Sequence, residues 1–196
     1  MLKRCDWCLK NDLYVNYHDN EWGTPVHDDR KIFEFLLLEG VQAGLSWLTV
    51  LRKRNNYREA FDDYDPEIIA EYGEEKIAEL MNNAGIIRNK LKINSAVKNA
   101  KAFLRIQEEF GSFDKYIWNF IDGKPMQNSY KSLKDIPAET EISRIISKDL
   151  KKRGFTFVGP TIVYSHMQAT GMVNDHLIDC FRYLELRIIS DSEQHI

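Results

Sequence analysis

Apolar residues recur at helical spacing along most of the chain. After Asp28, a candidate N-cap, apolar side chains between 32 and 37 form one stripe with a period close to that of an α-helix. A longer stripe of the same kind covers 91–104 and stops before Gly111, a residue type that commonly ends helices. Both segments are therefore predicted to be amphipathic helices that bury one face.

Cap and turn residues divide the rest of the chain into further helices. Asp65-Pro66 is a cap followed by a first-turn proline, Ser112 precedes a short aromatic segment, and Asp122-Gly123 ends that segment. The other predicted helices cover 45–61, 76–83, 141–152 and 160–171. Residues 124–140 are predicted to be a loop with little regular structure. We expect an all-α chain of roughly eight or nine helices.

Length, charge and cysteine content limit the class of protein. A chain of 196 residues suits one domain or two small lobes sharing a core, and its net charge of −3 permits only a local basic patch. No apolar stretch follows a basic start in the way that a secretory leader would show, and no apolar run approaches the ~20 residues of a membrane span. Three cysteines are too few for a disulfide framework. We expect a soluble, cytoplasmic protein without a membrane partner, monomeric by default.

The two ends of the chain contain residues that commonly bind metal ions. Cys5, Cys8 and His18 lie near the N-terminus, and His176 and Cys180 lie near the C-terminus. The last two are four residues apart, a spacing that predicts one face of a helix. Thiolates and imidazoles together are typical of zinc, and four protein ligands make a closed structural site. At the N-terminal end, spacing alone favours the Cys-x2-Cys pair.

The segment KKRGFTFVGPT at 151–161 contains a basic helix end, a turn bounded by two glycines and a helix opened by proline. Backbone N–H groups near Gly159 could bind a phosphate oxygen with the help of the helix dipole. Lys151, Lys152 and Arg153 would add positive charge. An ordinary helical hairpin that happens to contain two glycines explains the segment about equally well.

The segment LEGVQAGLSW at 38–47 places a carboxylate next to an apolar run. Glu39 follows that run, so it is expected at the edge of the core, where a carboxylate must be paired, hydrogen-bonded or functional. Gly40 and Gly44 permit a close approach or a sharp bend before Trp47. The pattern by itself favours the simpler interpretation, a helix–turn–helix connection with a solvated Glu39.

Aromatic residues are concentrated near the N-terminus. Trp7, Tyr14, Tyr17 and Trp22 lie close to His18 and Glu21. Aromatic faces stack on nucleobases and attract cations. The alternative is that these rings simply cover the core with a small N-terminal layer.

Several long motifs occur in one order: Y-x2-YHD-x-EWG from Tyr14, LE-x3-AGLSW from Leu38, AGIIR from Ala84, KK-x-GF-x-FVG from Lys151 and VNDH from Val173. This series resembles the constitutive 3-methyladenine DNA glycosylase I family of bacteria, over residues 3–182. The resemblance implies a two-lobed helix-hairpin-helix glycosylase fold with the base pocket between the lobes. We expect one domain over 1–183 and a variable tail over 184–196.

The resemblance also implies a ligand set and an activity. One structural zinc ion would join the termini, and its implied ligands are Cys5, His18, His176 and Cys180, with Cys8 left as a spare thiol. The implied reaction is hydrolysis of the N-glycosidic bond of 3-methyladenine in alkylated double-stranded DNA. No lysine occupies a Schiff-base position, so we expect an abasic product without strand cleavage. Asp175, beside an implied zinc ligand, is interpreted as structural.

Residue roles follow from the same resemblance. Glu39 is the expected catalytic residue: it would accept hydrogen bonds from the base edge, and its charge would favour the cationic substrate and the cation-like transition state at the sugar. The base pocket is expected to contain Tyr14, Tyr17, Trp22, Trp47 and Trp7. Two residues, Gln42 and Leu45, are expected to enter the gap left by the extruded nucleotide. The predicted phosphate contacts are Lys151, Lys152, Arg153 and the amides near Gly159.

Three other functions are compatible with parts of the sequence. A zinc-stapled DNA-binding module would lack catalysis, and a base-release assay separates it from a glycosylase. A hydrolase with catalytic zinc would need an open coordination position, which four protein ligands do not leave. A helical interaction protein would leave the ordered series of motifs unexplained.

Overall fold

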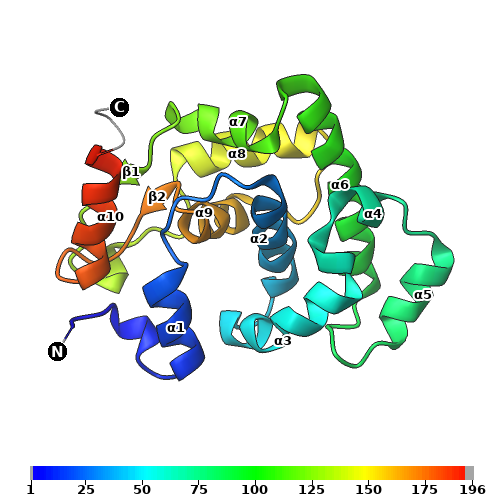
Figure 1. Ribbon diagram of the computed structural model, residues 1–196, viewed down its shortest axis with the longest axis horizontal. Coiled ribbons are helices and arrows are strands. Elements are labelled where there is room, and N and C mark those ends of the chain that lie inside the picture. Colours follow the sequence, from blue (N-terminus) through cyan, green and yellow to red (C-terminus); the bar gives the residue numbers. More distant parts are fainter. Residues whose placement is uncertain (1, 193–196) are drawn as a thin grey trace.

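The computed structural model describes residues 2–192, which are mostly helical (Figure 1). The α-helices are α1 (Asp12–Asn20), α2 (Asp29–Gln42), α3 (Trp47–Ala60), α4 (Pro66–Ala70), α5 (Glu74–Asn82), α6 (Lys90–Phe110), α7 (Phe113–Trp118), α8 (Glu141–Lys152), α9 (Pro160–Ala169) and α10 (Phe181–Ser192). The 3₁₀ turns are η1 (Asp6–Cys8), η2 (Asp62–Tyr64), η3 (Asn119–Ile121) and η4 (Leu133–Asp135). Two short parallel strands pair, β1 (Met126–Gln127) and β2 (Val173–Asn174).

The predicted helix ends are confirmed where a capping residue marks them. The carboxylate of Asp28 accepts the Lys31 amide at 2.8 Å at the start of α2. Asp65 accepts the first amides of α4, and Ser112 does so for α7. Gly111 ends α6 in the left-handed conformation, with φ of 86°. Local hydrogen bonding explains why these ends could be read from sequence.

Two helices were not predicted, α1 and α10. Within residues 2–192, α1 buries only Tyr17 and His18, so it has no apolar stripe that a periodic pattern could reveal. The prediction that His176 and Cys180 share one helix is wrong, because α10 begins at Phe181. They lie instead in a turn segment, where the side chain of Asn174 accepts the His176 amide at 3.3 Å. Such Asn side-chain bonds compete with helix formation.

The central element of the core is α2. It is buried along most of its length and contacts α3, α6, α7 and α9, which surround it (Figure 1). The largest apolar cluster extends from α2 into α6, where Phe33 packs edge-on against Phe103 at 5.0 Å. Because α2 runs through this core, its C-terminal end carries Glu39 into the interior of the molecule.

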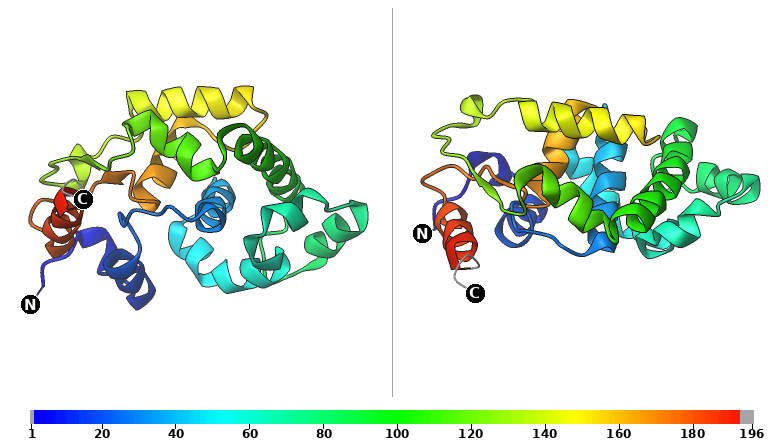
Figure 2. Two further views of the ribbon diagram at one scale, coloured as in Figure 1. Left: turned by 45° about the horizontal axis from the view of Figure 1, so that its top comes forward. Right: turned by 90° about the horizontal axis from the view of Figure 1, so that it is seen from above.

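The two ends of the described chain lie side by side. The N-terminal segment and α1 lie near α10, whereas α4 and α5 lie at the opposite end of the molecule (Figure 1). The helices α8 and α9 pack against each other, and α8 runs along one side of the molecule in both views of Figure 2. None of the helices in the part of the chain that the structure describes is long and apolar enough to cross a membrane.

The expected boundary between domain and tail at 183/184 falls inside a helix, because α10 runs from Phe181 to Ser192. The last part of the expected tail, 193–196, lies outside the described residues.

Candidate functional site

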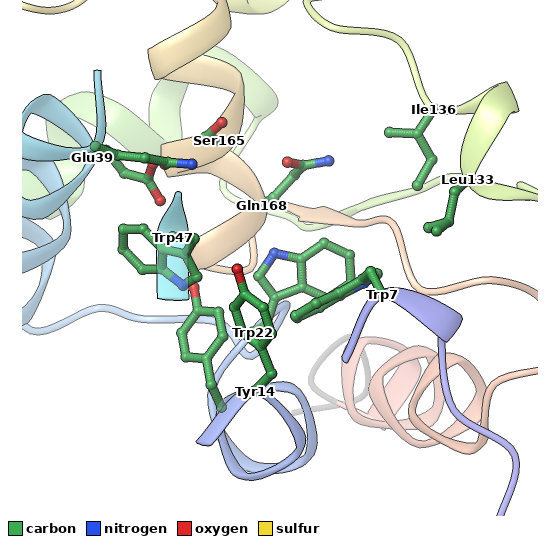
Figure 3. Close-up of a pocket in the computed structure, with 11 residues that line it drawn as sticks. Trp7, Tyr14, Trp22, Glu39, Trp47, Leu133, Ile136, Ser165 and Gln168 are labelled. Carbon is green, nitrogen blue, oxygen red and sulfur yellow. The ribbon is translucent and has the colours of Figure 1, made fainter. Parts of the chain in front are cut away.

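A cavity of about 340 Å³ opens between the aromatic N-terminal segment, the end of α2 and the inner face of α9 (Figure 3). This volume is at the lower end of the ~300–1,000 Å³ that small-molecule sites usually occupy. The cavity brings together seven residues that sequence analysis had named: Trp7, Tyr14, Tyr17, Trp22, Glu39, Gln42 and Trp47. They come from η1, α1, the turn after α1, α2 and the start of α3.

The aromatic rings form the walls of the cavity. The indole of Trp7 packs edge-on against Tyr14 at 5.5 Å and against Trp22 at 5.1 Å between ring centroids. Tyr17 lies 5.6 Å from Trp47 with the rings tilted by 52°. The Tyr14 hydroxyl accepts the Leu48 amide at 2.9 Å, which ties α1 to α3. Edge-to-face packing holds the rings rigidly and leaves ring faces available to a flat ligand.

Glu39 is the polar group of this cavity that lacks a full set of partners. Its side chain is buried, with 4% of the residue exposed, and burial raises its carboxyl pKa to about 8. Among residues 2–192, neither its Oε2 atom nor the Trp47 Nε1 atom has a hydrogen-bond partner. Both residues line the cavity. A buried polar atom without a partner is costly, so these two atoms indicate a place where a ligand supplies the missing bonds.

Four other lining residues were missed by sequence analysis: Leu133, Ile136, Ser165 and Gln168. Leu133 and Ile136 come from the segment predicted as a structureless loop, and they lie across the cavity from Glu39 (Figure 3). Ser165 and Gln168 come from α9. No motif identified them, because a single leucine or serine in a helix or loop has no pattern that distinguishes it. A second cavity of about 200 Å³ continues past Ser165 to the 42–45 turn.

A second site lies beside the first, where the two ends of the chain meet. Cys5, His18, His176 and Cys180 are buried, and one ligand atom from each lies within 4.8 Å of all the others. The Cys180 Sγ atom is 3.4 Å from His18 Nε2 and 3.6 Å from His176 Nδ1. A tetrahedral ion with zinc-like bonds of about 2.0 and 2.3 Å would separate sulfur from nitrogen by about 3.5 Å. The four residues could therefore hold a metal ion that joins the termini.

The neighbours of these four residues also suit a metal site. His18 Nδ1 is 2.7 Å from an Asp19 carboxylate oxygen, and His176 Nε2 is 2.9 Å from the Trp22 carbonyl. Each imidazole thus has its second nitrogen held, as metal-ligating histidines usually do. Cys8 is outside the cluster, and its thiol donates to the Cys5 carbonyl at 3.1 Å. The spacing favoured Cys5 and Cys8 as the N-terminal ligand pair, but the fold brings His18, and not Cys8, to the cluster.

Comparison with known proteins decides the family. The family described as methyladenine glycosylase matches residues 7–183. The chain belongs to the methyladenine glycosylase family. It is 48% identical over 180 residues to the DNA-3-methyladenine glycosylase of Haemophilus influenzae, covering 92% of this chain and 97% of that relative. It is 47% identical over 182 residues to DNA-3-methyladenine glycosylase 1 of Escherichia coli, covering 93% and 97%.

Solved structures of methyladenine glycosylases have the same fold. A crystal structure of 3-methyladenine DNA glycosylase I, 51% identical, superposes with a TM-score of 0.89 and covers 91% of this chain and 98% of that one. The enzyme from Staphylococcus aureus, 38% identical, was solved to show how it recognises 3-methyladenine. It superposes with a TM-score of 0.89 over 92% of this chain and 96% of that one. The mostly helical architecture expected from sequence is thereby confirmed.

The glycine-bounded turn of this methyladenine glycosylase joins α8 to α9, and Gly159 is the N-cap of α9. Lys151 and Lys152 are exposed at the end of α8. Arg153 differs from them, because its guanidinium donates to Asp149 at 2.7 Å and to Glu109 at 2.7 Å. Arg153 is thus already occupied by ion pairs within the protein, while the two lysines are the exposed cations of this turn.

Asp175 of this methyladenine glycosylase is buried and fully engaged. Its carboxylate accepts hydrogen bonds from Asn128 at 2.7 Å, Tyr164 at 2.6 Å and Gln168 at 2.8 Å. Three donors on one carboxylate leave it little capacity to activate a water molecule. Its contacts suit the structural interpretation, and they orient Gln168, which lines the cavity.

Proposed function

We propose that this chain is a base-excision repair enzyme that hydrolyses the N-glycosidic bond of 3-methyladenine in alkylated DNA. One observation carries the assignment beyond family membership: a buried carboxyl group, Glu39, has an oxygen without a partner in a cavity walled by aromatic rings. The two curated relatives are both named DNA-3-methyladenine glycosylases, and their high coverage supports the same activity here.

Recognition in this proposal depends on charge. Alkylation at N3 makes the adenine in DNA cationic, and each good cation–π contact favours a cation by about 0.5–2 kcal/mol. Trp47 and Tyr17 would supply the stacking faces, and Tyr14, Trp22 and Trp7 would complete the cage. Glu39 would accept hydrogen bonds from the base edge. A bound cation favours the ionised carboxylate, so binding lowers the pKa of Glu39 from its raised value.

The chemical step in this proposal needs little help from the enzyme at the leaving group. The cationic base is already a good leaving group, so no general acid is needed to protonate it. Water attacks the sugar carbon and loses a proton to the solvent. The bond to the base breaks, and its electron pair leaves with the base, which departs as neutral 3-methyladenine. Glu39 stabilises positive charge on the base and the sugar in the transition state. Among residues 2–192, no lysine lines the cavity, which supports a monofunctional enzyme that leaves an abasic site without a Schiff base.

Contacts with double-stranded DNA are proposed around the cavity. Gln42 is the last residue of α2 and Leu45 lies in the turn that follows; both line the second cavity and would fill the space left by the extruded nucleotide. The α8–α9 hairpin would act as the helix-hairpin-helix element. Lys151, Lys152 and the amides after Gly159 would bind phosphate, and Arg153 would stabilise the hairpin through its ion pairs.

The metal in this proposal is zinc, held by Cys5, His18, His176 and Cys180. Four protein ligands leave no open coordination position, so the ion would stabilise the joined termini and take no part in catalysis. We expect Cys8→Ser to retain stoichiometric zinc by elemental analysis and His18→Ala to lose it. The opposite pattern would restore the Cys5–Cys8 pair as the ligand set.

The proposal places a monomeric enzyme in the cytoplasm. None of the three cysteines forms a disulfide bond in the part of the chain that the structure describes, which supports a reducing compartment.

The deciding experiment measures release of free base from DNA treated with a methylating agent, with products separated by chromatography. Wild type should release 3-methyladenine, and Glu39→Gln should reduce the rate by about 10²-fold, as expected for loss of a charge that stabilises the transition state. Glu67→Gln, an exposed carboxylate on α4, is the matched control and should behave as wild type. No release by wild type would overturn the activity; undiminished release by Glu39→Gln would overturn only the role of Glu39.

A further inference from the structure

The C-terminal end of α2 is held by a side chain from another helix. The ammonium group of Lys92, on α6, donates to the backbone carbonyls of both Val41 and Ala43 at 2.6 Å. These carbonyls flank Gln42 on either side. The last carbonyls of a helix have no partner within it, and a cation there also interacts favourably with the helix dipole.

The backbone near Gln42 changes direction abruptly. Ala43 leaves the helical conformation with φ of −46° and ψ of 113°, and Gly44 follows with φ of 79°. The Leu45 amide closes the turn on the Gln42 carbonyl. Lys92 therefore bonds the two carbonyls at the point where the chain turns from Glu39, in the base cavity, to Leu45, which lines the second cavity.

Lys92 is itself positioned by the AGIIR motif that sequence analysis singled out. The carbonyl of Gly85 accepts hydrogen bonds from Lys53 at 3.0 Å and from Asn56 at 3.1 Å, both on α3. Further along, the Ile87 amide donates to the Tyr57 hydroxyl at 3.0 Å. These bonds anchor the segment before α6 to α3.

Asn89 then caps α6 by accepting the Lys92 amide at 3.2 Å. The AGIIR motif and the Asn89 cap together fix the first turn of α6, from which Lys92 reaches α2.

We propose that Lys92 is a positioning residue for base extrusion, which holds the 41–45 turn rigid so that Gln42 and Leu45 can replace the extruded nucleotide in the duplex. The proposal rests on the proposed function. Extrusion costs a few kcal/mol in lost base stacking and pairing. If the turn were flexible, Gln42 and Leu45 would not stay in the space that the extruded nucleotide leaves in the duplex. Lys92 does not line the base cavity, so binding of the free base should not depend on it.

The test compares Lys92→Met with Lys90→Met, a matched change at an exposed lysine in the first turn of the same helix. Three quantities are measured: kcat/KM for 3-methyladenine release from duplex DNA, the same from single-stranded DNA, and the affinity for free 3-methyladenine by tryptophan fluorescence. Lys92→Met should lower the duplex value by about tenfold or more, since small misplacements of positioning groups have effects of that size. The other two values should remain near wild type, and Lys90→Met should change none of the three.

A second comparison tests whether Lys92 acts through the turn. In a Gln42→Ala/Leu45→Ala background, adding Lys92→Met should cause no further loss on duplex DNA, because the side chains it positions are gone. An equal loss on duplex, single strand and free base would overturn the proposal, as would an additive loss in that background. If Lys92→Met does not fold, Lys92→Gln is judged by the same two criteria. Failure of wild type to release base would instead contradict the proposed function.

Discussion

Two buried glutamates on α2 have opposite surroundings. Glu34, in the middle of the helix, is 3% exposed and forms ion pairs with Lys31, Arg54 and Arg58. Burial alone would raise its pKa, but the bonds from Arg54 and Lys31 outweigh burial and lower the pKa below its ordinary value. Glu39, five residues later, is 4% exposed, and burial without a cation raises its pKa to about 8.

The difference shows what distinguishes a structural carboxylate from a binding one. Arg54 donates to Glu34 and also to Glu21, so the Glu34 charge joins α2, α3 and the turn after α1. Within residues 2–192, Glu39 has no such partner, so burial of its charge lowers the stability of the folded protein. The natural partner for a carboxylate in that position is a cationic ligand.

Breaking the Glu34 network should have the largest effect on stability. Glu34→Gln removes one of the two carboxylates that pair with the buried Arg54 guanidinium, while Glu21 remains as the other. Complete loss of a partner typically costs about 3–5 kcal/mol, which is the upper limit here. We expect the free energy of unfolding in urea to fall by up to that amount at pH 7. Because the folded pKa of Glu34 is lowered, its stabilisation is present above its ordinary value of 4.5 and is lost at lower pH. A difference from wild type that did not shrink in acid would contradict this assignment.

Glu39→Gln should raise the free energy of unfolding, whereas Glu34→Gln should lower it. The folded pKa of Glu39 is about 8 and its ordinary value is 4.5, so wild type loses stability as pH rises between these values. The loss is about 1.4 kcal/mol per pH unit, and the glutamine variant does not incur it. We expect the variant to unfold at a higher urea concentration than wild type, with the gap widening from pH 5 to pH 8. If the stabilities of the two proteins changed in parallel with pH, the assignment of Glu39 as a buried carboxyl group without a partner would be wrong.

The smallest predicted effect concerns the aromatic cage beside Glu39. Trp47→Leu removes one cation–π contact with the alkylated base, worth about 0.5–2 kcal/mol, so kcat/KM for base release should fall by about 2- to 30-fold. Phe110→Leu is the matched control. It removes a ring that lies 4.9 Å from the Arg153 guanidinium, a cation of the protein itself. Base release by the control should equal that of wild type; equal losses in both variants would point to general destabilisation.

Prediction from sequence was most accurate where structure depends on local bonds. Asp28, Asp65 and Ser112 each cap a helix through an amide within three residues, so the residue type and its position are enough. The lining residues Ser165 and Gln168 could not be predicted in this way. They reach the cavity only because α9 packs against α2, a contact between segments far apart in the sequence.

The sequence by itself determined where most helices begin and end, and which thiols, imidazoles, rings and carboxylates the chain could bring to a site. Only the tertiary structure decided which of them meet. It placed His18, and not Cys8, beside Cys5, His176 and Cys180, and it gave cations to Glu34 but none to Glu39. The physical reason is that helix caps depend on neighbours along the chain. The free energy of a buried charge depends instead on groups that folding brings from distant segments.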